Sequence, residues 1–141
     1  MASITIKTKE QFEDILNGAT IFASGGGGPR SIGQGVIKEI LSKGESVELI
    51  DATDISDTAI GAVAAGVGSP DAVSGTGIFD AAQNAWKELA KRLNKNLDFV
   101  SPGEVGAGNT FIPLIIAARQ NIPVIDGSDG TRQRPRFHPH H

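Results

Sequence analysis

Short apolar segments alternate along this chain with segments of helical periodicity, and this alternation is the feature that most constrains the fold. The clearest helical pattern spaces its apolar residues by three and four positions: Phe79, Ala82, Trp86, Leu89 and Leu93. Short apolar segments typical of strands lie at residues 47–50, 98–100 and 123–125. Strands and helices in this order predict an α/β layered domain with a mainly parallel sheet flanked by helices.

The first part of the chain predicts an edge strand followed by two helices. Residues 3–7 alternate apolar and polar side chains, as an edge strand does. Thr8 followed three residues later by Gln11 is typical of a capping box, and we expect that first helix to end at Gly18. A second helical pattern begins near Ile32 and is expected to end at Gly44.

The second part of the chain predicts a buried strand and a final helix. Residues 59–65 are small and apolar, which predicts a strand buried on both faces. Residues 66–77 and 101–108 are rich in glycine and are expected to form loops. Residues 111–120 predict a helix that Thr110 would cap.

The length and the net charge of the chain limit the classes of protein to which it can belong. A chain of 141 residues is about the size of one domain, so we expect a single domain over residues 1–130 and a tail over residues 131–141. The net charge of −3 provides no field that attracts nucleic acid. No apolar run approaches the ~20 residues that span a bilayer, and the first ten residues lack a signal-peptide pattern. We therefore expect a cytoplasmic protein with no nucleic-acid or membrane partner.

The residue types that are absent restrict the chemistry. The chain has no cysteine and no tyrosine, and its three histidines are all terminal: His138, His140 and His141. Acid–base chemistry within the fold must therefore come from Asp, Glu, Lys or water. Asp51, Asp126 and Asp129 could supply oxygen ligands, but no residue requires a metal, and we expect no cofactor.

Candidate ligand-binding residues follow the predicted strands, because ligands collect at the carboxyl ends of parallel strands. The run Gly25, Gly26, Gly27 and Gly28 precedes a predicted helix, where backbone amides can receive an anion. The run lacks the Gly-Lys-Ser/Thr of a phosphate-binding Walker loop. A plain turn between packed elements is the alternative.

Acidic and basic side chains add further candidates. Glu104 lies among glycines before a very apolar helix and could act as a general base, or it could merely cap that helix. Asp51 and Asp126 each follow a strand, where turn and N-cap roles are common. Arg30, Arg132 and Arg134 could bind carboxylate or carbonyl groups, or could be solvated surface charges.

Several of these segments, in the same order, resemble one known family. Residues 18–28 are similar to the "Gly-Ala-x-Ile-Leu-Gly-Ser-Gly-Gly-Gly-Gly" opening of the S-methyl thiohydantoin desulfurase-like family. Residues 104–109 resemble its "Glu-Ile-Gly-Gly-x-Asn" segment with one residue more, and residues 112–126 resemble its "Pro-Leu", "Ala-Ala-Arg" and "Leu-Pro-Val-Val-Asp" continuation. The resemblance extends from about Asn17 to Pro135.

The chain also departs from the family pattern. In the segment that the family writes "Asp-Ala-Asp-Gly-Met-Gly-Arg-Ala-Phe-Pro-Glu", Asp126, Arg132 and Pro135 match, whereas the second acid and the last Glu do not. Asp129 is an acid displaced by one residue. Family members are longer and continue into a β-rich second region, so this chain resembles their N-terminal domain.

The resemblance implies a hydrolase of a five-membered cyclic amide, of the S-methyl thiohydantoin or hydantoin type. It implies Glu104 as the base for water and Asp126 as an orienting or acidic group. The substrate would be bound by the glycine loop with its preceding serine and by two side chains: Ser24, Gly25, Gly26, Gly27, Gly28, Asn109 and Arg132.

A different class of function stays open beside the enzyme. The same glycine loop would equally suit a non-catalytic module that binds a small anion, or an assembly subunit. Residues 59–65 and 111–118 are apolar around most of their circumference, which predicts a homo-oligomer.

Overall fold

The fold is built on a five-stranded sheet. The computed structural model describes residues 3–23, 27–66 and 77–127. The strands are β1 (Ile4–Ile6), β2 (Val47–Ile50), β3 (Gly61–Ala64), β4 (Phe99–Pro102) and β5 (Val124–Ile125). They lie in the order β1-β2-β5-β4-β3, and only the β1–β2 pair is antiparallel. The predicted α/β class with a mainly parallel sheet is therefore confirmed.

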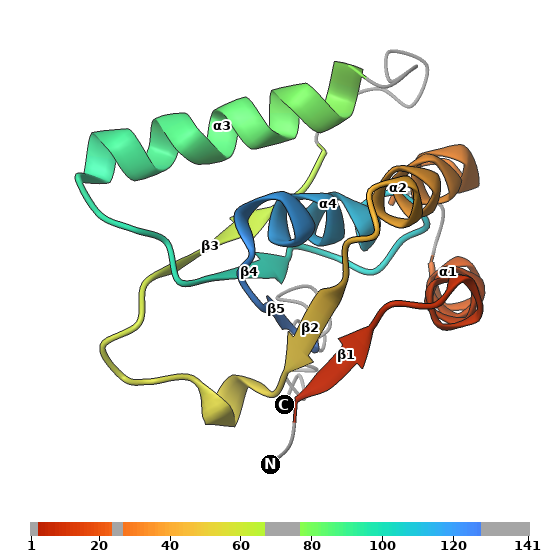
Figure 1. Cartoon of the computed structure of the whole chain (residues 1–141), viewed down its shortest axis with the longest axis horizontal. Coiled ribbons are helices and arrows are strands. Elements are labelled where there is room, and N and C mark those ends of the chain that lie inside the picture. The colour runs from red at the N-terminus through yellow and green to blue at the C-terminus, as the bar shows by residue number, and fades with distance from the viewer. Residues whose placement is uncertain (1–2, 24–26, 67–76, 128–141) are drawn as a thin grey trace, which may run out of the picture.

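Four helices accompany the sheet: α1 (Lys9–Phe22), α2 (Arg30–Ser42), α3 (Gly77–Leu93) and α4 (Phe111–Gln120). Helix α4 packs on the strands between α2 and α3, and α1 packs against α2 (Figure 1). Because α4 is enclosed in this way, residues 111–117 are all buried. In the described part of the chain, no helix is long and apolar enough to cross a membrane.

The hydrophobic core lies between α4, its neighbouring helices and the central strands. Its side chains with less than 2% exposure include Phe12 and Leu16 of α1, Val36 and Ile40 of α2, and Phe111 of α4. Full burial of one such side chain stabilises a fold by about 1.5–3 kcal/mol. The regularly spaced apolar side chains of the helices thus pack around α4.

Helix α1 begins where the sequence predicts and ends later. The Thr8 Oγ1 atom accepts a hydrogen bond from the Gln11 backbone N–H (3.2 Å), and Gln11 Oε1 accepts one from the Thr8 N–H (3.1 Å), which confirms the capping box. The predicted end at Gly18 is wrong, because the helix continues to Phe22. One interior glycine costs a helix only about 1 kcal/mol, and beyond it Ala19 is buried and Thr20 Oγ1 accepts a hydrogen bond from Arg30 of α2.

The prediction of a strand buried on both faces at residues 59–65 is also wrong. Strand β3 pairs only with β4 and forms an edge of the sheet, with Val63 51% exposed. The phenyl ring of Phe99 occupies the space where Gly61 would carry a Cβ. The ring therefore accounts for glycine at position 61 of this strand.

The predicted C-terminal end of α2 is confirmed, whereas the predicted capping of α4 by the Thr110 side chain is wrong. Gly44, with a φ of +63°, lies just beyond the last residue of α2, as expected of a glycine that ends a helix. Thr110 precedes α4 but makes no side-chain capping bond. Its Oγ1 atom instead accepts a hydrogen bond from the Gly106 backbone N–H (3.1 Å).

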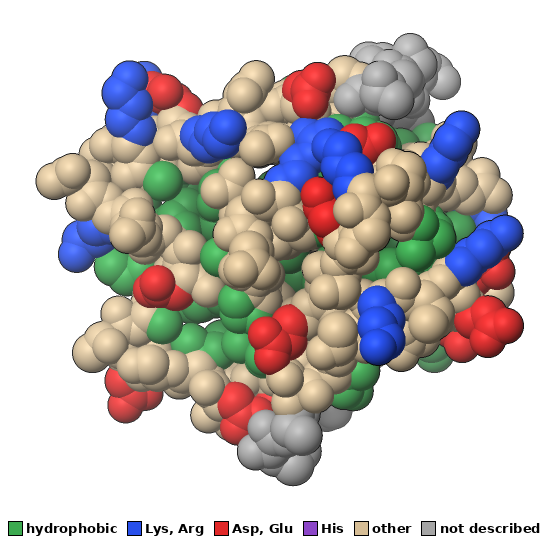
Figure 2. Space-filling view, viewed as in Figure 1, with side chains coloured by type: hydrophobic (Ala, Val, Ile, Leu, Met, Phe, Trp, Pro, Cys, Tyr) green, Lys and Arg blue, Asp and Glu red, His purple; other side chains and the backbone are tan. Residues whose placement is uncertain are grey.

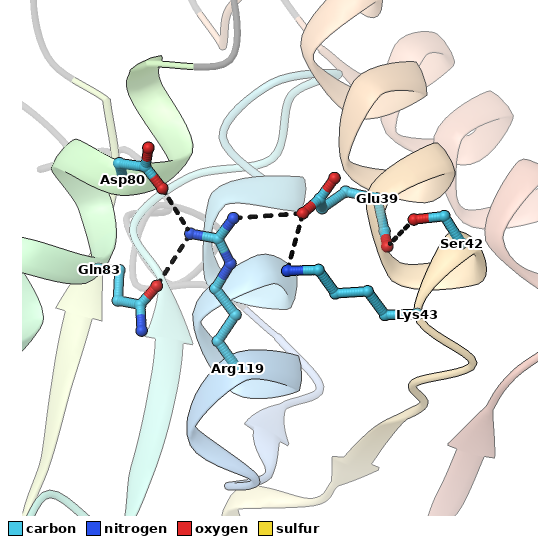
Figure 3. Close-up of polar contacts among 6 residues, drawn as sticks. All are labelled: Glu39, Ser42, Lys43, Asp80, Gln83 and Arg119. Carbon is cyan, nitrogen blue, oxygen red and sulfur yellow. Dashed lines mark hydrogen bonds and ion pairs between the residues drawn. The ribbon is translucent and has the colours of Figure 1, made fainter.

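Arg119 joins α4 to both flanking helices (Figure 3). Its Nη1 atom donates to Asp80 Oδ1 (3.1 Å) and Gln83 Oε1 (2.9 Å) on α3, and its Nη2 atom lies 3.5 Å from Glu39 Oε1 on α2. Lys43 Nζ lies 3.0 Å from the same oxygen. The Lys43 ammonium, and secondarily the Arg119 guanidinium, hold the pKa of Glu39 below its ordinary value.

Charged side chains of both signs are interspersed on the face of the molecule that Figure 2 shows. Lys and Arg side chains stand beside Asp and Glu side chains, with apolar surface between them. This face therefore presents no extended patch of a single charge.

Candidate functional site

Asn109 links two of the predicted loops through its side chain. The residue is 5% exposed, and its Oδ1 atom accepts a hydrogen bond from the Gly66 N–H (2.7 Å). Its Nδ2 atom donates to the Gly66 carbonyl (3.2 Å) and to Glu104 Oε1 (2.6 Å). The side-chain amide thus satisfies both backbone groups of Gly66, as a neighbouring strand residue would, and it also orients the Glu104 carboxylate.

A third loop joins the same cluster through its backbone. The Gly27 carbonyl accepts hydrogen bonds from the Gly108 N–H (2.9 Å) and the Asn109 N–H (2.8 Å). A Cβ on Gly27 would overlap the Cα of Gly106, and a Cβ on Gly106 would overlap the Cα of Gly27. The two chain segments can approach this closely only because neither residue has a side chain.

Strand direction explains why these loops meet. Gly66 follows β3, and Glu104 follows β4, which runs parallel to it. The carboxyl ends of parallel strands share an edge of the sheet, and ligands of α/β proteins bind at that edge. The structure therefore brings together Glu104, Asn109 and Gly27 of the predicted site.

Asp126 lies in a separate part of the same sheet edge. It follows β5, its backbone N–H donates to the Ile50 carbonyl (2.8 Å), and the residue is exposed. Together with Gly127 it lines a cleft instead of joining the Asn109 cluster.

That cleft is a concave feature of this edge. It has a volume of about 230 Å³ and lies between α1, the ends of the central strands and the loop before α4. Its lining is almost entirely apolar, and it includes Ile15, Gly18, Ala19, Phe22, Leu49, Pro102, Val105, Leu114, Val124 and Ile125. Val105 directly follows Glu104, so one loop contributes to both the cleft and the Asn109 cluster.

The remaining predicted site residues lie outside the Asn109 cluster or outside the described part of the chain. Gly28 has a φ of +85° and stands just before α2, whose N-cap residue Pro29 provides no side-chain bond. The guanidinium of Arg30 donates to Asn17 Oδ1 (2.6 Å) and Thr20 Oγ1 (3.0 Å), so it joins α2 to α1. Several other candidates lie outside the described residues: Ser24, Gly25, Gly26, Asp129, Arg132, Arg134 and the three histidines.

Asp51 caps a short helix, which is the structural role that the sequence offered as the alternative to ligand binding. Its Oδ1 atom accepts hydrogen bonds from the Thr53 N–H (2.9 Å) and Thr53 Oγ1 (2.8 Å), at the start of a short 3-10 helix over Ala52–Asp54. Across the described ranges, no group of three or more Asp, Glu or His side chains could hold a metal ion.

Sequence reasoning missed Gly66 as a partner of Asn109. The two residues are 43 positions apart, and no local pattern marks their pairing. It also missed the contact between Gly27 and Gly106, although two glycine-rich loops in one chain are a signal of close backbone approach.

Comparison with known proteins identifies a family and a solved structure that this chain resembles. The model of the family described as "S-Me-THD-like, N-terminal domain" matches residues 10–139. The chain is also similar to an X-ray crystal structure of a protein from Chromobacterium violaceum, with 24% sequence identity and a TM-score of 0.66. That likeness is one of fold, and it covers 91% of this chain and 35% of that chain. No curated protein matches the chain significantly.

Proposed function

Because the chain belongs to the S-Me-THD-like, N-terminal domain family, we propose that it is a hydrolase-like domain acting on a five-membered cyclic amide of the S-methyl thiohydantoin or hydantoin type. With an S-methyl thiohydantoin, water adds to the ring carbon that carries the methylthio group. The carbon–sulfur bond then breaks, methanethiol leaves with one proton, and a carbonyl remains on the ring.

The observation that carries this proposal is the hydrogen bond between Asn109 Nδ2 and Glu104 Oε1. A carboxylate that acts as a general base must be held in one orientation toward its water. The buried Asn109 amide provides that orientation and is itself fixed by Gly66. In this proposal the second oxygen of Glu104, which is an exposed residue, takes the proton of the attacking water.

The contacts of Asn109 favour a positioning role over its predicted role as a ring-binding residue. Both hydrogens of its Nδ2 atom are used, by Gly66 and by Glu104. In this proposal the ring is bound by backbone amides of residues 24–28 and by Arg132. Asp126, at the neighbouring cleft, orients the ring or protonates the leaving group.

The non-catalytic alternative has one observation in its favour. The close approach of Gly27 and Gly106 accounts for these two glycines without any ligand. In addition, the Gly27 carbonyl, a hydrogen-bond acceptor, is the group engaged in this contact. An assembly subunit needs only this packing, so the observation favours that form of the alternative, whereas a module that binds a small anion also needs free backbone N–H groups in the loop.

One assay separates the two functions. The purified chain is incubated with S-methyl thiohydantoins, and released methanethiol is measured with a thiol reagent. We expect turnover that Glu104→Gln abolishes and that Glu48→Gln, a change at an exposed residue of β2, leaves intact. Circular dichroism checks that both variants fold. A ligand that raises the melting temperature without any thiol release would favour the binding module.

A further inference from the structure

The cleft beside Asp126 is a concave site whose apolar lining has no role in the proposed chemistry. Residues from α1, β2, β5 and α4 line it, and Asp126 and Thr110 are its main polar contributors. Its position at the carboxyl edge of the parallel strands is where α/β proteins bind ligands. The cleft therefore lies in the right place to hold part of a substrate.

Its size and lining restrict what it can hold. An engineered apolar cavity of about 150 Å³ in another protein accommodates benzene, and this cleft measures about 230 Å³. A group the size of isobutyl or benzyl fits such a volume. Leu49, Leu114 and Val124 offer that group apolar contacts only, and Asp126 is an acid, so an anionic group would lose its hydration without gaining a cationic partner.

The cleft is connected to the proposed reaction centre at two points. Val105 lines the cleft and directly follows Glu104, the proposed base. Asp126, the proposed orienting or acidic residue, also lines the cleft. Because the proposed function assigns both carboxylates to one ring, it places that ring beside the apolar lining of the cleft.

We propose that this cleft receives an apolar substituent on the substrate ring, and that it selects rings bearing an isobutyl- or benzyl-sized group at the carbon between the ring carbonyl and the ring nitrogen. This inference rests on the proposed function. Burying a side chain of this size makes ring binding about 10- to 100-fold tighter than binding of the unsubstituted ring.

Gly18 gives a direct way to fill the cleft. It lies within α1 and lines the cleft, and a Cβ added to it would meet no other heavy atom within 4 Å. Gly18→Leu extends a side chain into that space, whereas Gly18→Ala adds one carbon and serves as the matched control. Both replacements favour a helix more than glycine does, so both variants are expected to fold.

The experiment measures binding by calorimetry for three hydantoins with hydrogen, isobutyl or carboxyethyl at that ring carbon. Methyl NMR of Leu49, Leu114 and Val124 shows in parallel whether the cleft is occupied. We expect the isobutyl ring to bind most tightly and to shift these methyl signals. Gly18→Leu should remove its advantage over the unsubstituted ring, and Gly18→Ala should largely keep it.

The other outcomes overturn the inference in distinguishable ways. Equal binding of all three rings, with unshifted cleft methyls, overturns the role of the cleft and leaves the proposed function standing. Failure of every ring to bind or turn over removes the proposed function and the inference together. Cleft methyl signals that change with protein concentration alone show that a second copy of the chain fills the cleft, which also overturns the inference.

Discussion

The side-chain amide of Asn109 forms hydrogen bonds with both the N–H and the carbonyl of Gly66, 43 residues away in the sequence. This pairing ties the segment after β3 to the loop before α4. The same amide donates to Glu104, so the orientation of the proposed base depends on the contact between two loops. Stability and activity should therefore respond together to changes at Asn109.

Replacement of Asn109 by alanine is expected to lower the free energy of unfolding by about 2–3 kcal/mol. The change removes two part-buried hydrogen bonds to Gly66 and one to Glu104, and each such bond contributes about 0.5–1.5 kcal/mol. Urea denaturation measures the loss. Asn84→Ala, at an exposed position of α3, should change stability by less than about 0.5 kcal/mol. Equal stability of the two variants would contradict the structural role of the Asn109 amide.

Alanine at Gly27 or at Gly106 should destabilise the protein by about 1–3 kcal/mol. The added Cβ in either variant would overlap backbone atoms of the other glycine, and backbone cannot yield as a flexible side chain does. Gly18→Ala has open space around the new atom and should stabilise α1 by up to about 1 kcal/mol. Thermal denaturation of the three variants tests the contrast, and a stabilising Gly27→Ala would show that the loops do not approach in solution.

The ion pairs of Glu39 predict a pH dependence of stability. The folded-state pKa of Glu39 lies below its ordinary value of 4.5, chiefly because of Lys43 and then of Arg119. A lowered folded-state pKa stabilises the protein above the unfolded-state pKa, and this contribution disappears as the pH falls through the folded-state pKa. Glu39→Gln should therefore be less stable than the unchanged chain near pH 7 and should lose that deficit under acid. Denaturation curves between pH 7 and pH 2 measure the difference, and a deficit that persists at pH 2 would refute the electrostatic origin.

The chain is predicted to self-associate, for a reason that differs in part from the one its sequence suggests. Helix α4 buries residues 111–117 within the chain, so it leaves little apolar surface for a second copy to cover. Val63 of β3, in the other segment that the sequence indicated, is 51% exposed, and Ile21 and Phe22 at the end of α1 are 78% and 82% exposed. Light scattering should give a mass above the 14.6 kDa of one chain, and Phe22→Ser should reduce it. A mass of 14.6 kDa at micromolar concentration would contradict self-association.

The sequence predicts most helices and strands well, because apolar periodicity reports directly on which side chains are buried. Helix α4 has the bounds that the pattern predicts, and the capping box at Thr8 forms. The errors occur where tertiary packing overrides a local rule. Beyond Gly18, α1 keeps contacts with the fold through buried Ala19 and through Thr20, which bonds to Arg30, and the ring of Phe99 explains Gly61 in the run of small residues that suggested a central strand.

The contacts of the candidate site are harder to predict from the sequence than the helices and strands are. The position of Glu104 at the carboxyl edge follows from strand order, which the alternation of elements predicts. Its partner Asn109 is a recognisable candidate, but the bond from Asn109 to Gly66 depends on how two distant loops meet. Spacing along a chain carries no information on such a contact. The assignment of Asp126 to a separate cleft likewise requires the three-dimensional arrangement.

The enclosure of α4 has a consequence for how readily the site can change shape. Asn109 and Thr110 stand at the start of a helix whose next seven residues are buried against the sheet and two other helices. These residues cannot shift alone, because any displacement would disturb close-packed neighbours. Asn109 is therefore held in place before any ligand binds, and a ligand that uses Glu104 in the orientation set by Asn109 loses little affinity to the ordering of that amide.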